Sequence, residues 1–300
     1  MSDPLSEVVR LLQPHSVFTN PISGTGNWSI SYSRYGKPSF CIMLQGCCSL
    51  EVDGHEPITI GAGDFVLLPA TPPFTISGGD PVPSTLVDPE TMADGMEERR
   101  YGNPDGEAEM RSLGGAFLFE NTDPQLLIAL LPPVVHVKNS ARLARLVGMV
   151  GEEFSEQRPG REFMLSHLMG LMLVEAMRSS TSTHAPPGLL RGLGDERLAP
   201  ALKKMHESVS HPWTVSELAA AAALSRSAFF DRFSRTVGVA PMAYLLSWRT
   251  EIAKDLLRRE RLPVAHVAER VGYASTSTFS AAFSRQVGLS PSRYAASAPS

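Results

Sequence analysis

The side chains best suited to recognition chemistry lie in two stretches of the chain that repeat one another. Residues 225–244 read SRSAFFDRFSRTVGVAPMAY, and residues 275–294 read STSTFSAAFSRQVGLSPSRY. Ser, Phe, Arg, Val, Gly, Pro and Tyr recur in register, fifty positions apart. Between the shared positions stand Arg, Asp, Ser and Thr, which can pair with phosphates and exchange hydrogen bonds with base edges.

Each stretch has the pattern of a helix that follows another helix across a short turn. In the first copy Ser225 stands where a helix N-cap is expected, and Gly238 is a natural C-terminal stop. Phe229 and Phe233 are four residues apart, so they share one helix face and can be buried together. Residues 263–288 repeat these features. Both copies are therefore predicted to be helix-turn-helix units.

The segment between the copies, residues 241–260, predicts one amphipathic helix. At 1.5 Å per residue it would span roughly 30 Å, close to the ~34 Å between successive major-groove segments that such units read. The spacing predicts two DNA-reading units on one rigid helix. A duplicated helical pair without a role in DNA binding would also explain the shared Phe, Gly, Pro and Tyr.

The charge of the chain is divided unevenly. Residues 1–188 carry 12 Lys and Arg against 22 Asp and Glu, a net charge of −10, and residues 189–300 carry 15 against 9, a net charge of +6. A basic C-terminal third beside an acidic N-terminal part favours a polyanionic partner for the basic end.

Residues 196–296 resemble the DNA-binding domain of the AraC/XylS family of transcription regulators. The motifs that carry the resemblance are WTVSELAAAAALSRSAFFDRFSRTVGVAPMAYLLSWRTEIAKDLL and VAHVAERVGYASTSTFSAAFSRQVGLSPSRY. The resemblance implies seven helices, with two recognition helices inserted into neighbouring major grooves of double-stranded promoter or operator DNA. It also implies RNA polymerase as a partner.

By position, the resemblance assigns DNA contacts to both recognition helices. The first would present Arg226, Ser227, Phe230, Asp231 and Arg232. The arginines could meet phosphates or a guanine edge, the aspartate a cytosine amine, and the phenylalanine a thymine methyl group.

The second recognition helix would present short hydroxyl side chains, namely Thr276, Ser277, Thr278 and Ser280. Ala281 stands where many family members carry Arg. The second helix is therefore expected mainly to hold phosphates and to sense DNA shape.

The N-terminal part reads as strands followed by helices. SFCIML, CSLEV, PITI and DFVLLP are short runs joined by QG, DGHE and GAGD, which predicts a small antiparallel barrel or sandwich. Residues 77–111 are polar and rich in Gly and Pro, which favours a mobile surface loop over a lid. Apolar spacing predicts two helices at 141–157 and 162–177. They would carry a homodimer interface, with Leu168 and Met172 as interface positions.

Residues 46–77, together with LPPVVHV at 131–137, resemble the cupin-type sensor domains that precede this DNA-binding module. The resemblance implies an effector inside the barrel and dimerisation through the helices after it. The expected fold class is α+β and multidomain, with an N-terminal cupin-like β-barrel followed by helices and a C-terminal all-α domain. Its domains are a cupin-like effector-sensing and dimerisation domain at 1–178, a linker at 179–195, and an all-α double helix-turn-helix domain at 196–300.

Five residues are candidates for lining the effector pocket, although each would also suit a simple core: Trp28, Tyr32, Phe40, Cys41 and Cys48. The thiols allow an alternative reading, an oxidant or electrophile sensor. Since Cys47 and Cys48 are adjacent on a predicted strand, one should face inward and the other outward. The acidic surroundings weigh against a reactive thiolate.

The sequence predicts a cytoplasmic regulator that is not an enzyme, with no catalytic residue, no metal and no cofactor. The N-terminal histidines show no His-x-His pair of the kind that enzymatic cupins use to hold a metal, and three cysteines are too few for a four-Cys zinc site. The opening residues MSDPLSEVVR lack the pattern of a secretory signal, and no run of ~18 apolar residues predicts a membrane span. The predicted function is an effector-responsive, sequence-specific transcription regulator, more specifically an activator. The alternative is a cupin-type metal enzyme tethered to a DNA-binding module.

Overall fold

The computed structural model describes residues 3–12, 14–91, 98–119, 131–138, 140–156, 158–179 and 187–297. They form two compact units. The sheet unit comprises Pro14–Phe119 and Leu131–Ser180, and the helical unit contains Met1–Gln13 and Thr181–Ser300. No helix in the described ranges has both the length and the apolar character needed to cross a membrane.

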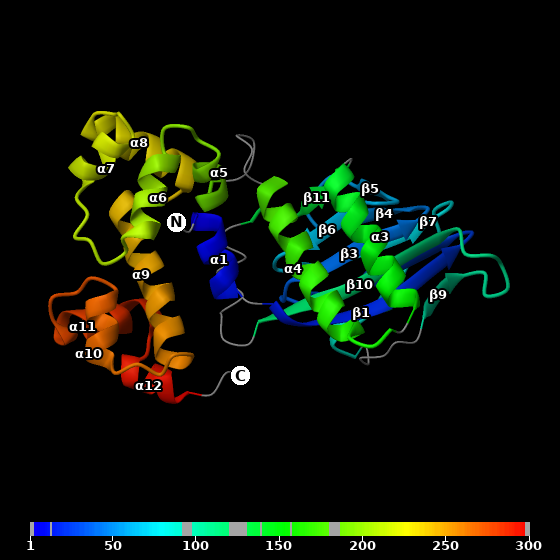
Figure 1. The fold of residues 1–300 in the computed structure, drawn as a ribbon. Helices are drawn as coiled ribbons and strands as arrows, with labels where there is room; N and C mark the ends of the chain where they lie inside the picture. Colours follow the sequence, from blue (N-terminus) through cyan, green and yellow to red (C-terminus); the bar gives the residue numbers. More distant parts are fainter. Residues whose placement is uncertain are drawn as a thin grey trace. The chain divides into compact units, whose positions relative to one another are not determined.

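The sheet unit contains two sheets (Figure 1). The six-stranded sheet has the order β11-β6-β3-β10-β1-β9, with the bounds Val135–Val137, Phe65–Leu68, Ser39–Gln45, Met110–Phe119, Pro14–Thr25 and Arg99–Gly102. The five-stranded sheet has the order β5-β4-β7-β2-β8, with the bounds Ile58–Gly61, Cys47–Val52, Phe74–Gly78, Trp28–Tyr32 and Thr85–Val87.

The predicted closed barrel is corrected to two open sheets. Among the described strands no hydrogen-bonded ladder joins one sheet to the other. The sheets end in strands of three or four residues, namely β5, β8, β9 and β11, which are too short to continue the ladder around a barrel. The interior between the sheets is apolar, as in a sandwich. Its buried residues include Ile30, Met43, Leu50, Val52, Ile60 and Val66.

Part of the segment predicted as a surface loop is ordered as edge strands. Strand β8 pairs in parallel with β2, and β9 pairs in parallel with β1. A short 3₁₀ turn, η1, covers Pro89–Thr91. Edge strands need only one row of hydrogen bonds, so a polar, Gly-rich sequence can form them without a buried face.

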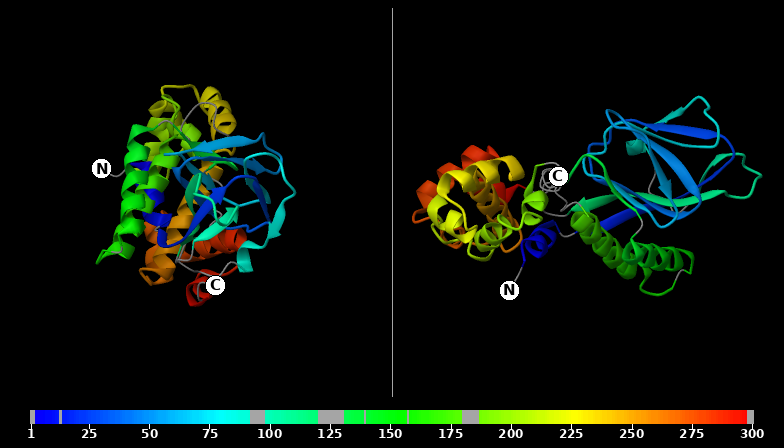
Figure 2. Two further views of the ribbon diagram at one scale, coloured as in Figure 1. Left: turned by 90° about the vertical axis from the view of Figure 1, so that its right-hand side faces the viewer. Right: turned by 90° about the horizontal axis from the view of Figure 1, so that it is seen from above.

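Two helices cover the outer face of the six-stranded sheet, and both predicted helices are confirmed. They are α3, Ala141–Ser155, and α4, Arg161–Ser179. Figure 2, in its right-hand view, shows them as a green layer against that sheet. The buried face of α4 carries Leu168, Met169, Met172, Leu173, Ala176 and Met177.

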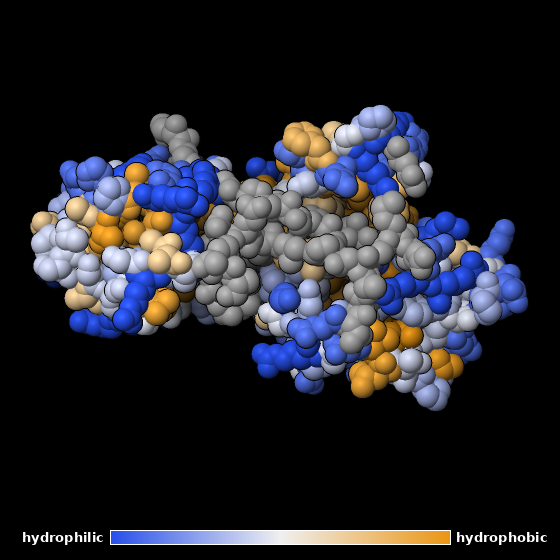
Figure 3. Space-filling model, turned by 90° about the horizontal axis from the view of Figure 1, so that it is seen from below, coloured by the Kyte–Doolittle hydropathy of each residue, from blue (hydrophilic) through white to orange (hydrophobic). Residues whose placement is uncertain are grey.

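Apolar side chains also stand on the outer side of these helices. Phe163 is 66% exposed, Leu171 is 49% exposed and Met164 is 40% exposed on α4, and Met149 of α3 is 45% exposed. Figure 3 shows one face of the molecule, on which apolar residues gather in separate patches among hydrophilic ones. Helix α4 is therefore apolar on two sides, and one of them is uncovered in the single chain.

The helical unit contains the seven helices that the resemblance implies. They are α6 to α12, with the bounds Ala199–Glu207, Val215–Ala221, Arg226–Val237, Pro241–Arg258, Val264–Arg270, Thr276–Val287 and Pro291–Ala296. Two further helices, α1 (Pro4–Leu12) and α5 (Leu189–Leu193), belong to the same unit. Helix α5 falls inside the segment predicted as a linker, and α1 was not predicted.

Candidate nucleic-acid interface and effector cavity

The two sequence repeats fold into the same local structure. Ser225 precedes α8, and its hydroxyl accepts a hydrogen bond from the Ala228 amide at 3.3 Å. Ser275 precedes α11 and accepts from the Thr278 amide at 3.2 Å. Both helices end at a glycine in the left-handed region, with φ +86° in α8 and +78° in α11. Each cap thus occupies the position that its repeat predicts.

The repeated aromatic residues form the same small core in each copy. The rings of Phe229 and Phe233 lie 5.5 Å apart, and those of Phe279 and Phe283 lie 5.6 Å apart. A tyrosine closes each core edge-on, 5.8 Å from Phe233 and 5.5 Å from Phe283. All four phenylalanines are buried. The four shared phenylalanines therefore help to hold the recognition helices in place, and their buried rings are not available for contact with DNA.

The residues predicted to meet DNA occupy accessible positions on α8. Arg226, Ser227, Asp231 and Arg232 are exposed. Phe230 is 44% exposed, whereas the neighbouring Phe229 is fully buried. Helix α8 thus presents two cations, one anion, a hydroxyl and an uncovered aromatic ring at accessible positions.

On α11, Thr276, Ser277 and Thr278 are exposed and Ser280 is partly exposed. Two of these hydroxyls already have a partner in the cap, because Ser275 Oγ lies 3.2 Å from Ser277 Oγ and 2.8 Å from Thr278 Oγ1. The face of α11 carries no charge at these positions. Its chemistry suits phosphate oxygens better than the bidentate reading of bases.

Arg232 has a protein partner that the sequence did not indicate. Its Nε donates to both carboxylate oxygens of Asp195, at 2.8 and 3.1 Å. Asp195 also accepts from the amides of Arg197 and Leu198, at 3.0 and 3.2 Å. Burial would raise the pKa of Asp195, but these hydrogen bonds outweigh it and hold the pKa below its ordinary value. The pair ties the recognition helix α8 to the turn before α6.

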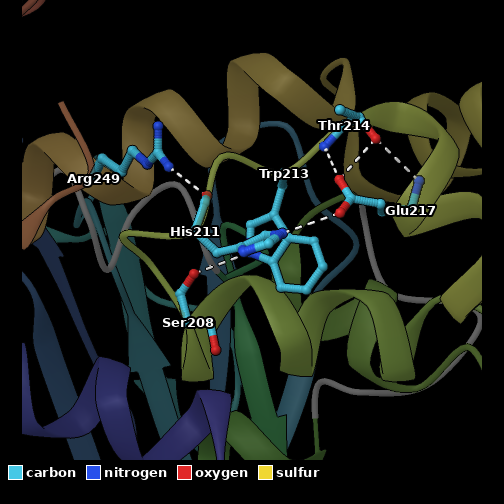
Figure 4. A network of polar contacts seen from close by, with 6 residues as sticks. All are labelled: Ser208, His211, Trp213, Thr214, Glu217 and Arg249. Carbon is cyan, nitrogen blue, oxygen red and sulfur yellow. Dashed lines mark hydrogen bonds and ion pairs between the residues drawn. The ribbon is translucent and has the colours of Figure 1, made fainter. Parts of the chain in front are cut away.

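The loop before α7 is fixed by a second polar network, shown in Figure 4. Thr214 and Glu217 form a capping box: the Thr214 amide donates to Glu217 at 2.8 Å, and Thr214 Oγ1 accepts from the Glu217 amide at 3.2 Å. His211 Nε2 lies 3.1 Å from Glu217 Oε1. Trp213 Nε1 donates to the Ser208 carbonyl at 3.0 Å.

Arg249 of α9 joins this loop to the helix between the two copies. Its Nε donates to the Val209 carbonyl at 2.9 Å, and its Nη2 donates to the His211 carbonyl at 2.8 Å. The turn of the second copy packs on the same loop, since a Cβ at Gly272 would lie 2.5 Å from the Ser210 carbonyl oxygen. Gly272 also has φ +84°, which favours glycine. Arg249 therefore stands where the two helix-turn-helix copies meet.

The sheet unit contains a cavity of about 150 Å³ between its two sheets. Four of the five predicted effector residues line it: Tyr32, Phe40, Cys41 and Cys48. The fifth, Trp28, lies outside the lining. Trp28 is buried against Gly24 and Gly78, where an added Cβ would lie 2.5 Å from its Nε1.

The three thiols occupy different environments. Cys47 is exposed and Cys48 is buried, which confirms the predicted inward and outward alternation. Burial raises the pKa of Cys41 to about 11, partly offset by a hydrogen bond with Ser112. Burial also raises the pKa of Cys48, with smaller effects from the other two thiols. The two cavity thiols are therefore protonated at neutral pH and are poor nucleophiles.

Two family models divide the chain between them. A cupin model matches residues 3–182, and a helix-turn-helix domain model matches residues 218–297. A putative AraC-like transcription regulator of Streptomyces antibioticus is 35% identical over 301 residues, which cover 97% of this chain and 98% of that one. The chain belongs to the AraC-like family of transcription regulators. It is a DNA-binding regulator with a cupin-type N-terminal domain.

Other AraC-like proteins match over different lengths. The RCS-specific HTH-type transcriptional activator RclR of Escherichia coli strain K12 is 28% identical and covers 97% of this chain and 96% of its own. Among solved structures, the DNA-binding domain of AdpA in complex with a target DNA is 34% identical. It covers 34% of this chain and 92% of that one, with a TM-score of 0.33.

Family membership gives the Asp195–Arg232 pair a testable consequence. Arg232→Ala should weaken operator binding by roughly five- to tenfold, equivalent to about 1–1.4 kcal/mol. Asp195→Ala should also weaken it, because loss of the ion pair and of the two amide hydrogen bonds releases α8 from the turn before α6. Fluorescence anisotropy with operator DNA would measure the affinity, and thermal unfolding the stability.

Arg226→Ala is the matched control, since Arg226 is exposed and no side-chain partner is recorded for it among the described residues. It should lower affinity without lowering the melting temperature. If Asp195→Ala instead raised the affinity, Arg232 would act only as a DNA contact that Asp195 competes for, and its positioning role would be wrong.

Proposed function

We propose that this chain is an effector-responsive transcription activator that binds promoter DNA with both helix-turn-helix copies at once. The observation that supports this most is the repeated cap and aromatic core, which holds α8 and α11 in equivalent settings on either side of α9. Helix α9 has 18 residues and so spans roughly 27 Å. That length suits two readers in neighbouring major grooves of one DNA face.

The two helices divide the work in this proposal. Helix α8 reads bases, with Arg226 and Asp231 as the direct contacts and Phe230 against a thymine methyl group. Arg232 contributes mainly by holding α8 to Asp195. Helix α11 grips the backbone through Thr276, Ser277, Thr278 and Ser280, so its specificity comes from the shape of the DNA.

The sheet unit supplies the signal. A small-molecule effector occupies the cavity between the two sheets, next to Tyr32, Phe40, Cys41 and Cys48. The regulator acts in the cytoplasm on double-stranded DNA, with RNA polymerase as its partner in activation. It uses no cofactor and catalyses no reaction. In the described part of the chain, no three His, Cys, Asp or Glu side chains come together as a metal site would need.

A homodimer forms through the outer face of α3 and α4. The exposed apolar residues Met149, Phe163, Met164 and Leu171 support this placement. Leu168 and Met172, which the sequence suggested as interface positions, are buried within the single chain at 3% and 0% exposure. Those two residues therefore stabilise the sheet unit itself, and the interface is assigned to the other side of α4.

DNA binding should be strongly salt-dependent. If each protomer neutralises about five phosphates, the affinity should fall roughly 10²- to 10³-fold between 50 and 200 mM salt. A mobility-shift titration of the full-length protein, on DNA selected from a random pool, measures this slope. Arg226→Ala should reduce the slope by about 1 if Arg226 meets a phosphate, and should relax base preference if it meets a guanine. A flat salt dependence would count against the proposal.

A further inference from the structure

The cavity between the sheets has a lining that limits the chemistry of its occupant. None of the described residues that line it is Asp, Glu, Lys, Arg or His. Its ionisable groups are the hydroxyls of Tyr32 and Tyr35 and the thiols of Cys41 and Cys48. Burial raises the pKa of Tyr32, Cys41 and Cys48, so these three groups are neutral at pH 7.

We propose that the effector is a small uncharged molecule, mainly apolar and of about benzene size, that carries one hydroxyl or carbonyl group. This inference rests on the proposed role of the cavity as the effector site. Its first support is volume. An apolar cavity of about 150 Å³ accepts a benzene-sized guest, whereas pockets for drug-sized ligands run to several hundred Å³.

The second support is the cost of burying a charge. A carboxylate or ammonium group in this cavity would lose its hydration without gaining an ionic partner from the described lining, and such burial is expensive. Arg99 interacts electrostatically with the Tyr32 hydroxyl but is not part of the lining. The hydroxyl itself lies 3.1 Å from that of Tyr101. An anion inside the cavity therefore has no cation to pair with among the lining side chains.

The aromatic walls favour a flat, apolar guest. The rings of Tyr32 and Phe74 stack 4.7 Å apart, and Phe40 contributes a third ring. Aromatic faces can also attract a cation, but no carboxylate from the described lining would balance it. A neutral aromatic or short aliphatic molecule fits these walls without that cost.

The hydrogen-bonding group follows from which polar side chains are already engaged. Ser39 and Thr71 bond to each other at 2.7 Å, and Ser112 bonds with Cys41. Asn20 lies in the lining on β1, opposite Gly114 of β10, and no hydrogen bond of its amide is recorded within the described ranges. That amide can donate to or accept from one hydroxyl or carbonyl of the guest.

Gly114 keeps this part of the cavity open. A Cβ there would lie 2.9 Å from Ile22 Cδ1, so any side chain would displace the cavity wall. Ala116, two residues along the same strand and also in the lining, faces the same way. It offers a position at which a larger side chain would fill the space.

The test uses three ligands of one size and different charge with the full-length protein at pH 7: benzyl alcohol, benzoate and benzylammonium. Benzyl alcohol should raise the melting temperature in a saturable manner at millimolar concentrations, and the two ions should not. Ala116→Leu should abolish the shift. Asn20→Ala is a second variant that leaves the cavity open, in case Ala116→Leu impairs folding. It should weaken the binding of benzyl alcohol roughly three- to tenfold and leave the binding of toluene unchanged.

The class of effector would be wrong if benzoate or benzylammonium stabilised the protein as well as benzyl alcohol does. It would also be wrong if no neutral member bound, or if binding were insensitive to both variants. Operator affinity measured in the same samples separates the two levels. If benzoate bound in the cavity and changed operator affinity, the cavity would still be the effector site, but the proposal that the effector is uncharged would be wrong. If a neutral ligand bound there without changing operator affinity, the effector role would fail instead.

Discussion

Phe233→Ala and Phe283→Ala should each destabilise the helical unit by ~3–5 kcal/mol, the usual cost of removing a buried aromatic side chain. Phe233 is 0% exposed and Phe283 is 1% exposed. Each ring contacts a phenylalanine one helical turn away and a tyrosine beyond the glycine stop. Truncation would leave a cavity between the recognition helix and its supports. Operator binding should therefore be lost through unfolding.

Thermal and urea unfolding of the full-length protein would measure this effect, together with the helical circular dichroism signal. Phe230→Ala is the matched control, because it removes the same side chain from the same helix at a position that is 44% exposed. It should leave the melting temperature nearly unchanged and alter only DNA affinity. If Phe233→Ala and Phe283→Ala both melted like the wild type, the buried cores could not be what positions α8 and α11.

The second large effect separates the two sides of α4. Met172→Glu should prevent the sheet unit from folding, because Met172 is fully buried and an unpaired buried carboxylate costs several kcal/mol. Leu171→Glu, at the adjacent position, should instead give a folded monomer. Its side chain is 49% exposed in the single chain, so a charge there stays in water until a partner covers it.

Sedimentation velocity at micromolar concentration, with circular dichroism on the same samples, distinguishes these results. The wild-type protein should sediment as a dimer, Leu171→Glu as a folded monomer, and Met172→Glu as misfolded or aggregated material. Leu171→Ala is the control for lost area without added charge. The proposed dimer face would be wrong if the wild type were monomeric, or if Leu171→Glu remained a dimer.

The helical unit could be predicted from sequence because its signals are local. Ser225 and Ser275 cap the helices that their spacing indicates, and the paired phenylalanines lie one turn apart on one face. Because the pattern repeats at a spacing of fifty residues, each signal occurs twice. Helix α1 was not predicted, although Val8, Leu11 and Leu12 are buried. Its nine residues are too few to show the helical period of apolar residues clearly.

The sheet unit was harder to predict because sheets depend on distant partners. The runs at β3 to β6 show alternating or continuous apolar patterns, whereas β8 and β9 are short edge strands whose side chains are exposed or half-buried. Closure of the barrel depends on whether the edge strands pair, and no local pattern encodes that. The two sheets pack face to face and remain open in the described residues.

The candidate site was also predictable only where local residue patterns indicate it, and not where contacts join distant parts of the sequence. Residue types on β2 to β4 located four of the cavity residues, but Trp28 packs elsewhere because Gly24 and Gly78 make room for its ring. Asp195 and Arg249 were missed. Asp195 pairs with a residue 37 positions away, and Arg249 bonds to carbonyls 38 and 40 positions away. Sequence spacing alone gives no sign of such contacts.

The central claim, that one chain reads two neighbouring major grooves, is tested most directly by hydroxyl-radical footprinting. Full-length protein would be bound to its preferred DNA, selected from a random pool, and compared with Arg226→Glu on α8 and Ser277→Glu on α11. Each protomer should protect two segments about 10 bp apart on one face of the duplex. Arg226→Glu should remove one segment and Ser277→Glu the other. A single protected segment per protomer, or loss of the same segment in both variants, would contradict the claim.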